Sequence, residues 1–68
     1  MVIRVSIIGP IKSVKEVEGS KMKVSELLKK LGLLSSEYVV LKNNVIVSED
    51  DIVNEGDNII VYPVKSGG

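Results

Sequence analysis

Cysteine and histidine are both absent from the 68 residues of this chain. Without a thiol or an imidazole, the protein lacks disulfides, Cys- or His-based metal sites and the commonest nucleophiles and general bases. The acidic stretch from Glu49 to Asp57 does not supply the ligand spacing around a central glycine that a calcium loop needs. Gly9, Gly32 and Gly56 are isolated turn glycines and make no phosphate-binding loop. We therefore expect a protein that is not an enzyme and binds no metal or cofactor of its own.

Phenylalanine and tryptophan are also missing, so the core must be built from aliphatic side chains. Valine, isoleucine and leucine account for nearly all of the 44% of residues that are hydrophobic. A chain of this length forms one domain, and such a domain buries only about 60% of the surface that its unfolded chain exposes. Because neither a disulfide nor a zinc site can reinforce it, its stability depends on dense packing.

Excess charge of either sign is absent, since nine basic and nine acidic residues cancel. A general attraction for nucleic acid therefore has no basis. The two signs are nevertheless segregated along the chain: Lys12, Lys15, Lys21, Lys23, Lys29 and Lys30 precede Glu49, Asp50, Asp51, Glu55 and Asp57. We interpret these groups as solvated faces in preference to a docking surface. With no signal-peptide pattern and no apolar run that could cross a membrane, we expect a cytoplasmic monomer without membrane or nucleic-acid partners.

The first half of the chain changes from a strand pattern to a helix pattern. Residues 1–8 alternate β-branched and polar side chains, which predicts a half-buried strand. Gly9-Pro10 indicates a turn, and a weaker strand from Ile11 to Glu18 completes a hairpin. Apolar residues spaced i, i+3, i+4 and i+7 then predict a helix from Val24 to Leu31. Gly32 suits its left-handed C-cap, whereas Lys23 offers no side-chain acceptor at its N-cap.

The second half predicts three strands and one sheet. Tyr38–Lys42 and Val45–Val47 form a hairpin around Asn43-Asn44, because asparagine tolerates the positive φ of a type I′ turn. A turn at residues 54–57 precedes a last strand, Ile59–Val64. The order β-β-α-β-β-β with one helix predicts an α+β fold with a mixed sheet covered on one face. The first and last strands are the most apolar, so we expect them side by side and parallel in the centre, with the helix in the crossover.

Two strands carry apolar residues on both faces, although one helix can cover only one. Ile59 and Val61 satisfy one face of the last strand, yet Ile60 and Tyr62 on the other are also apolar. In the strand at 38–42, either Tyr38 and Val40 or Val39 and Leu41 must point outward. Loops or the segment 45–53 could cover this second face. We favour a partner-docking surface, with the residues Ile60, Tyr62, Val64, Leu41 and Val39.

The last residues have little left to pack against. Pro63 should end ladder pairing, and the six residues from Pro63 to Gly68 can span up to about 20 Å when extended. Gly67 and Gly68 give a thin, freely rotating terminus, which suits insertion of a carboxylate into another protein's active site. A frayed end is the alternative. We therefore divide the chain into a domain, 1–64, and a flexible tail, 65–68.

These segments together resemble the ubiquitin-like sulfur carriers of the ThiS and MoaD type, including archaeal small modifier proteins and eukaryotic ubiquitin-related modifiers. Residues 24–32 look like the family's helix, 39–47 like its central hairpin, 55–61 like its turn before the last strand, and 63–68 like its tail. Only the tail is functionally specific. The family's usual Asn-Gly turn is Asn43-Asn44 here, and the link between Gly19 and Val24 is longer than usual.

The resemblance implies a β-grasp fold and a mechanism. An E1-like adenylating enzyme would use ATP and Mg²⁺ to adenylate the Gly68 carboxylate, and sulfur from a persulfide donor would replace AMP to leave a thiocarboxylate. Gly68 would carry the sulfur and Gly67 would give access, before delivery to a sulfur-acceptor synthase or thiolation enzyme. The product pathway stays open among thiamin, molybdopterin and tRNA thiolation, with a slight lean of the tail toward the molybdopterin or archaeal modifier branch. Two other functions stay open: a protein modifier joined to lysines through Gly68, and a binding module with an inert tail.

Overall fold

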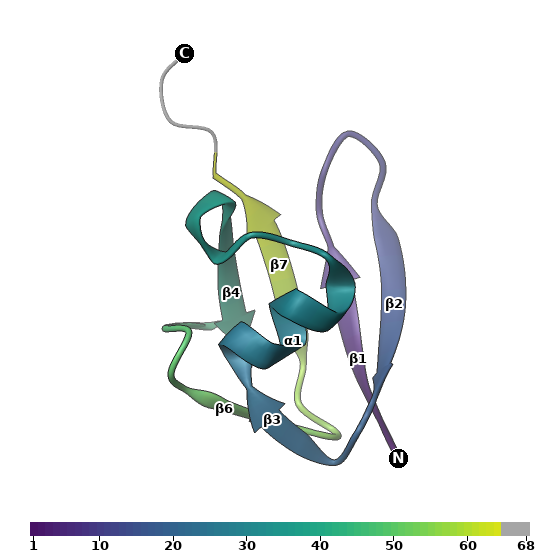
Figure 1. Ribbon diagram of the computed structural model, residues 1–68. Coiled ribbons are helices and arrows are strands. Elements are labelled where there is room, and N and C mark those ends of the chain that lie inside the picture. Colours follow the sequence, from purple (N-terminus) through teal and green to yellow (C-terminus); the bar gives the residue numbers. More distant parts are fainter. Residues whose placement is uncertain (65–68) are drawn as a thin grey trace.

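The main sheet lies behind a single α-helix in Figure 1, and the computed structural model describes residues 1–64 of the chain. The elements, in chain order, are β1 (Val2–Ile7), β2 (Ser13–Glu18), β3 (Lys21–Lys23), α1 (Val24–Leu31), a 3₁₀ helix η1 (Ser35–Glu37), β4 (Tyr38–Lys42), β5 (Val45–Val47), β6 (Ile52–Asn54) and β7 (Ile59–Pro63). The expected α+β architecture, a mixed sheet with one helix packed on one face, is confirmed. It is the β-grasp fold.

The first and last strands are central and parallel, as predicted. The main sheet has the order β2-β1-β7-β4-β5. Strand β1 pairs parallel with β7, placing Val5 opposite Ile59 and Ile7 opposite Val61. On the outer sides of this pair, β2 is antiparallel to β1 and β4 is antiparallel to β7. A parallel pair requires a long crossover connection, and α1 lies in that crossover (Figure 1).

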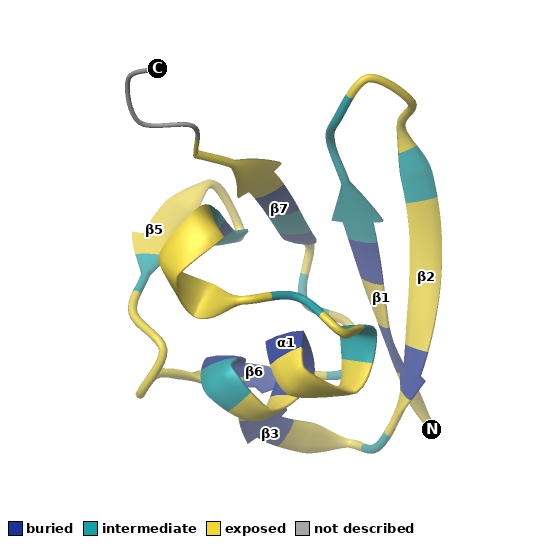
Figure 2. Cartoon of the chain, turned by 45° about the horizontal axis from the view of Figure 1, so that its top comes forward, coloured by how far each residue is buried: buried dark blue, intermediate teal, exposed yellow. Residues whose placement is uncertain are grey.

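One apolar core fills the space between α1 and the sheet. Alternate residues of the central strands, including Ile3, Val5, Ile59 and Val61, are almost fully buried. The helix contributes the side chains expected from its spacing, of which Leu27 is completely buried. Figure 2 shows this division as dark blue segments on the inner side of α1 and in the central strands. Aliphatic packing between one helix and one sheet face therefore stabilises a chain that has no cysteine for a disulfide.

A second, two-stranded sheet was not predicted. Strands β3 and β6 pair antiparallel, with Met22 opposite Val53, and both of these side chains join the core. The predicted order of five strands and one helix is therefore incomplete, since β3, β6 and η1 are additional elements. Each is only three residues long, and three residues are too few to establish a sequence period.

The small sheet also explains how the helix begins without a capping side chain. Lys23 is extended at the N-cap and makes no side-chain cap hydrogen bond, as its chemistry predicted. Instead, the N–H of Val24 donates to the carbonyl of Asp51 at 2.9 Å, and the N–H of Ser25 donates to that of Glu49 at 3.0 Å. Backbone carbonyls of the segment before β6 thus satisfy donors that a Ser or Asp side chain usually satisfies. At the other end, Gly32 adopts the predicted left-handed conformation, with φ 75°.

Three strand boundaries differ from the predictions. The first strand is Val2–Ile7 rather than residues 1–8. The second begins at Ser13 rather than Ile11, whose side chain is 83% exposed in the loop after Gly9-Pro10. The last ends at Pro63 rather than Val64.

Side-chain hydrogen bonds of Asn43 and Asp57 join the hairpin turn between β4 and β5 to the turn before β7, and these bonds are called the clasp below. Asn43 and Asn44 both have positive φ, as predicted for this turn. Asn43 Oδ1 accepts the N–H of Asn58 at 2.9 Å, and its Nδ2 donates to Asp57 Oδ1 at 3.3 Å. Asp57 Oδ2 also accepts the N–H of Asn54 at 2.8 Å. The hydrogen bond from the Asn54 backbone is the main cause that lowers the pKa of Asp57 below 3.8, in opposition to desolvation, which raises it.

The helix–sheet core can be tested by truncating Leu27. Because this side chain is 0% exposed, Leu27→Ala should lower the free energy of unfolding by about 2–5 kcal/mol. Leu34→Ala is the matched control, since Leu34 is 61% exposed and its loss should change stability by less than about 0.5 kcal/mol. Urea denaturation followed by circular dichroism measures both. Equal effects of the two substitutions would contradict the packing described.

The clasp around Asp57 predicts a dependence of stability on pH. Since the pKa of Asp57 is lower in the folded protein than its ordinary value of 3.8, its carboxylate stabilises the fold above pH 3.8. That contribution is lost as the pH falls through the lower, folded value. Urea midpoints measured from neutral to acidic pH should therefore fall less steeply for Asp57→Asn than for the natural protein.

The control for this experiment is Asp50→Asn, which removes a carboxylate from an exposed turn. It should reproduce the acid-side slope of the natural protein more closely than Asp57→Asn does. NMR titration of the Asp57 carboxyl offers a direct check, and a folded pKa at or above 3.8 would refute the role given to the clasp.

Candidate functional site

The face of the sheet that α1 does not cover carries a continuous apolar surface. The register places Val39 opposite Tyr62 on the neighbouring strands β4 and β7. It places Leu41 between Ile60 on β7 and Ile46 on β5. These five side chains, Val39, Leu41, Ile46, Ile60 and Tyr62, are called the open-face patch below.

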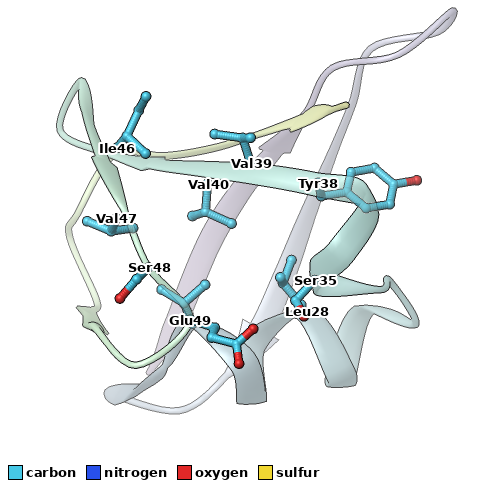
Figure 3. A pocket seen from close by; sticks show the side chains of 10 residues that line it. Leu28, Ser35, Tyr38, Val39, Val40, Ile46, Val47, Ser48 and Glu49 are labelled. Atoms are coloured by element: carbon cyan, nitrogen blue, oxygen red, sulfur yellow. The ribbon is translucent and has the colours of Figure 1, made fainter. Parts of the chain in front are cut away.

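The orientation of β4, which the sequence left undecided, is settled by this register. Val40 is 3% exposed and points to the core, so Val39 and Leu41 point to the open face. Figure 3 shows Val39 and Ile46 on one side of β4 and β5, and Val40 and Val47 on the other. Tyr62 is 41% exposed and Ile46 is 71% exposed, whereas the remaining three side chains of the patch are half-buried among their neighbours.

The alternative in which the segment 45–53 folds over this face is wrong. Strand β5 extends the main sheet at its edge by pairing with β4. Strand β6 pairs with β3, the strand that runs into α1, and so lies away from the patch. The segment therefore contributes Ile46 to the apolar surface instead of covering it.

Ile46 is the member of the patch that sequence reasoning missed. The segment Val45-Ile46-Val47 has three β-branched residues in a row, so its composition does not reveal which side chain faces the solvent. The signal was the two-residue turn at Asn43-Asn44, because turn length fixes the register of a hairpin. Counting back from that turn pairs Ile46 with Leu41.

The remaining predicted docking residue, Val64, lies directly beyond β7. Its side chain is 46% exposed, and its N–H donates to the carbonyl of Glu37 in η1 at 2.8 Å. Pairing thus continues for one residue past Pro63, whose ring nitrogen cannot donate. Ile60 and Tyr62 lead along β7 to this point, so the structure brings the patch and the end of the described chain together. Gly67 and Gly68 lie outside the described residues.

Groups that could perform chemistry are sparse in the part of the chain that is described. Within residues 1–64, no three His, Cys, Asp or Glu side chains gather where they could hold a metal ion. A hollow of about 170 Å³ lies between α1, η1 and the β4–β5 hairpin, with an apolar floor that includes Leu28 and Val40 (Figure 3). Its rim carries Ser35, Ser48 and Glu49. No helix of the described chain has the length and apolar character needed to span a bilayer.

Comparison with known proteins agrees with the fold. The model of the ThiS family matches residues 5–68. An uncharacterized protein of Archaeoglobus fulgidus is 35% identical to this chain over 68 residues, which cover the whole of both sequences. The family match includes β7, Val64 and the Gly67-Gly68 pair, as well as the helix and the central hairpin. The chain therefore belongs to the ThiS family, whose members are small carriers rather than catalysts.

Proposed function

We propose that this protein is a sulfur carrier whose working group is the carboxylate of Gly68. The observation that carries the proposal is the family match, which continues through the Gly67-Gly68 pair at residues 67–68. The fold supports it, because the chain reaches these residues from the central strand of the sheet, past the anchor of Val64 on Glu37.

The chemistry follows from the poor reactivity of a carboxylate. An E1-like enzyme, using ATP and Mg²⁺, converts the Gly68 carboxylate into an acyl adenylate and releases pyrophosphate. AMP is a good leaving group, so the outer sulfur of a persulfide donor can displace it and form an acyl disulfide with the Gly68 carbonyl. A thiol of the partner then attacks the donor's sulfur. The S–S bond of the acyl disulfide breaks, the donor and the attacking thiol become a disulfide, and the terminus leaves as a thiocarboxylate. The absence of a side chain at Gly67 and Gly68 lets the terminus enter a narrow active site. The carrier itself supplies the reacting carbonyl and its delivery, whereas the partner supplies the activation.

The open-face patch together with Val64 forms the surface by which the activating enzyme recognises this carrier. Tyr62 and Ile60 belong to the strand that leads to the tail, so a partner that covers them is correctly placed to receive Gly68. Aromatic side chains are frequent binding hot spots, because they bury a large area at a small cost in conformational entropy. The same surface suits the sulfur acceptor, which must receive the same terminus.

A second function, modification of other proteins, starts from the same adenylate. In that case the amine of a lysine on a target attacks the activated carbonyl of Gly68, and an isopeptide bond replaces the bond to AMP. The ubiquitin-like fold supports this candidate as well as the first. Digestion of host proteins would then yield peptides with a Gly-Gly remnant on lysine, whereas the sulfur carrier gains mass without conjugation.

The tail is tested by mass spectrometry of the intact protein isolated from its host. Exchange of one oxygen for sulfur should raise the mass by about 16 Da. Deletion of Gly67 and Gly68 should abolish both this gain and ATP–pyrophosphate exchange with the host's activating enzyme. Ser66→Ala is the control, because it keeps the length and both glycines and should retain activation. If the protein without Gly67 and Gly68 still supports the host's sulfur-dependent products, the sulfur-carrier proposal is wrong. The remaining alternative is then a binding module with an inert tail.

The patch is tested separately by Tyr62→Ala. Loss of a hot-spot aromatic typically costs more than about 1 kcal/mol of binding, so kcat/KM for adenylation should fall at least about fivefold. Val14→Ala is the matched control, since Val14 is an exposed apolar residue on the same face but on the edge strand β2. Thermal midpoints of both variants separate docking from folding. Unchanged kcat/KM for Tyr62→Ala at full stability would exclude the open-face patch as the docking surface.

A further inference from the structure

Strand β2 presents a six-residue edge that no strand of residues 1–64 covers. The N–H of Gly19 donates to the carbonyl of Met1 at 2.8 Å, and these two residues continue the register in which Val2 lies opposite Glu18. In an antiparallel pair, hydrogen-bonded and non-hydrogen-bonded positions alternate. The backbone N–H and C=O groups of Val14, Glu16 and Glu18 therefore point away from β1. By contrast, β5 at the opposite edge is three residues long.

A groove of about 480 Å³ lies beside this edge, between β2 and the last turn of α1. Ile7, Val17 and Leu31 supply apolar lining, and Lys15 and Lys30 lie at the same groove from the strand and the helix. Figure 2 shows β2 as exposed along most of its length, with the exposed and half-buried end of α1 next to it. A strand added to β2 would direct alternate side chains into this groove, because side chains alternate between the two faces of a sheet.

Glu16 and Glu18 also line the groove, but the charged side chains on its helix side are the two lysines. The two acidic residues of β2, Glu16 and Glu18, are opposite Arg4 and Val2, on the open face. There Glu16 pairs with Arg4 at 3.2 Å, and Glu18 pairs with the terminal amine of Met1 at 3.4 Å. Lys15 is opposite the buried Val5 and thus belongs to the helix side of the sheet, as does Lys30. No ion pair within residues 1–64 neutralises these two lysines.

We propose that the outer edge of β2 binds an extended segment of a partner protein as a sixth strand, with aliphatic side chains in the groove and acidic residues next to Lys15 and Lys30. Addition of a strand to a free edge gives affinity through the backbone, and the groove selects the side chains. An alternative role for charged residues on an edge strand is to prevent aggregation. That role needs no groove beside the strand, and charges of either sign fulfil it.

This site differs from the open-face patch in place and in chemistry. Strands β1 and β7 separate β2 from β4 in the sheet, so an added strand leaves Tyr62 and Val64 accessible. The inference does not depend on sulfur transfer, because it uses neither Gly67 nor Gly68.

The probe is a synthetic peptide of four alternating valine and isoleucine residues followed by three acidic residues. It is titrated into the ¹⁵N-labelled full chain. Amide signals of Val14, Glu16 and Glu18 and of the last turn of α1 should shift and saturate. A peptide with the same aliphatic core followed by three lysines should bind at least about tenfold more weakly, since it meets like charge at the groove.

Two variants test the backbone and the charge separately. Glu16→Pro removes an outward N–H without removing a hydrogen bond to β1 and should abolish binding. Glu16→Ala, which loses the same ion pair with Arg4, should retain it. Lys30 lies on the exposed face of α1. Lys30→Glu should weaken binding of the acidic peptide about tenfold or more, and should reduce the ratio of the affinity for the acidic peptide to that for the lysine peptide.

Three results would overturn the proposal: no shift of the β2 amides at about 1 mM peptide, equal binding by Glu16→Pro and Glu16→Ala in folded protein, or equal affinity for the two peptides. Shifts of the same amides with protein concentration alone would show that a second copy of the chain occupies the edge, which also contradicts an acidic partner segment.

Discussion

The parallel pairing of β1 with β7 is the interaction on which the rest of the fold depends. It joins the two ends of the domain through Val5 opposite Ile59 and Ile7 opposite Val61. A parallel pair cannot be closed by a tight turn, so the chain must cross over one face of the sheet, and α1 occupies that crossover. The pairing also buries the last strand between two others. The end of the described chain is thereby attached to the centre of the sheet, which is the hardest part of a small domain to unfold locally.

The acidic segment before β7 has a structural role that its composition conceals. Asp51 accepts the N–H of Ser48 at 2.7 Å, and Asp57 accepts the N–H of Asn54 at 2.8 Å, so each carboxylate closes the turn three residues before it. The carbonyl of Asp51 also receives the first N–H of α1. The segment thus supports the start of the helix from one side and the clasp to Asn43 from the other. Our interpretation of these acids as a solvated face described their exposure but not their hydrogen bonds.

A feature could be predicted from the sequence when the residues that specify it are close together in the chain, and could not when they are far apart. The helix, the β4–β5 hairpin and the parallel central pair were predictable, because period, turn chemistry and apolar content lie within short stretches of sequence. Strands β3 and β6 were not, since each gains stability only from a partner about thirty residues away. The backbone capping of α1 was hidden for the same reason. In the candidate site, Val39, Leu41, Ile60 and Tyr62 were found by asking which apolar side chains one helix cannot cover. Ile46 required the register of the hairpin.

The arrangement of the two surfaces has a consequence for a carrier that must meet more than one partner. Under the proposed function, an activating enzyme and a sulfur acceptor both need Gly68. If both used the open-face patch, they would compete for it and could not bind together. A carrier with this surface alone would have to dissociate fully between the two steps and would leave a reactive terminus in solution. Strands β1 and β7 lie between β2 and β4 in the sheet. A partner segment bound at the edge of β2 would therefore keep the carrier attached while the patch is vacated. Tethering converts the second encounter into an intramolecular one at a high effective concentration. Under these proposals, even a weak site on β2 would be sufficient to favour direct transfer over release.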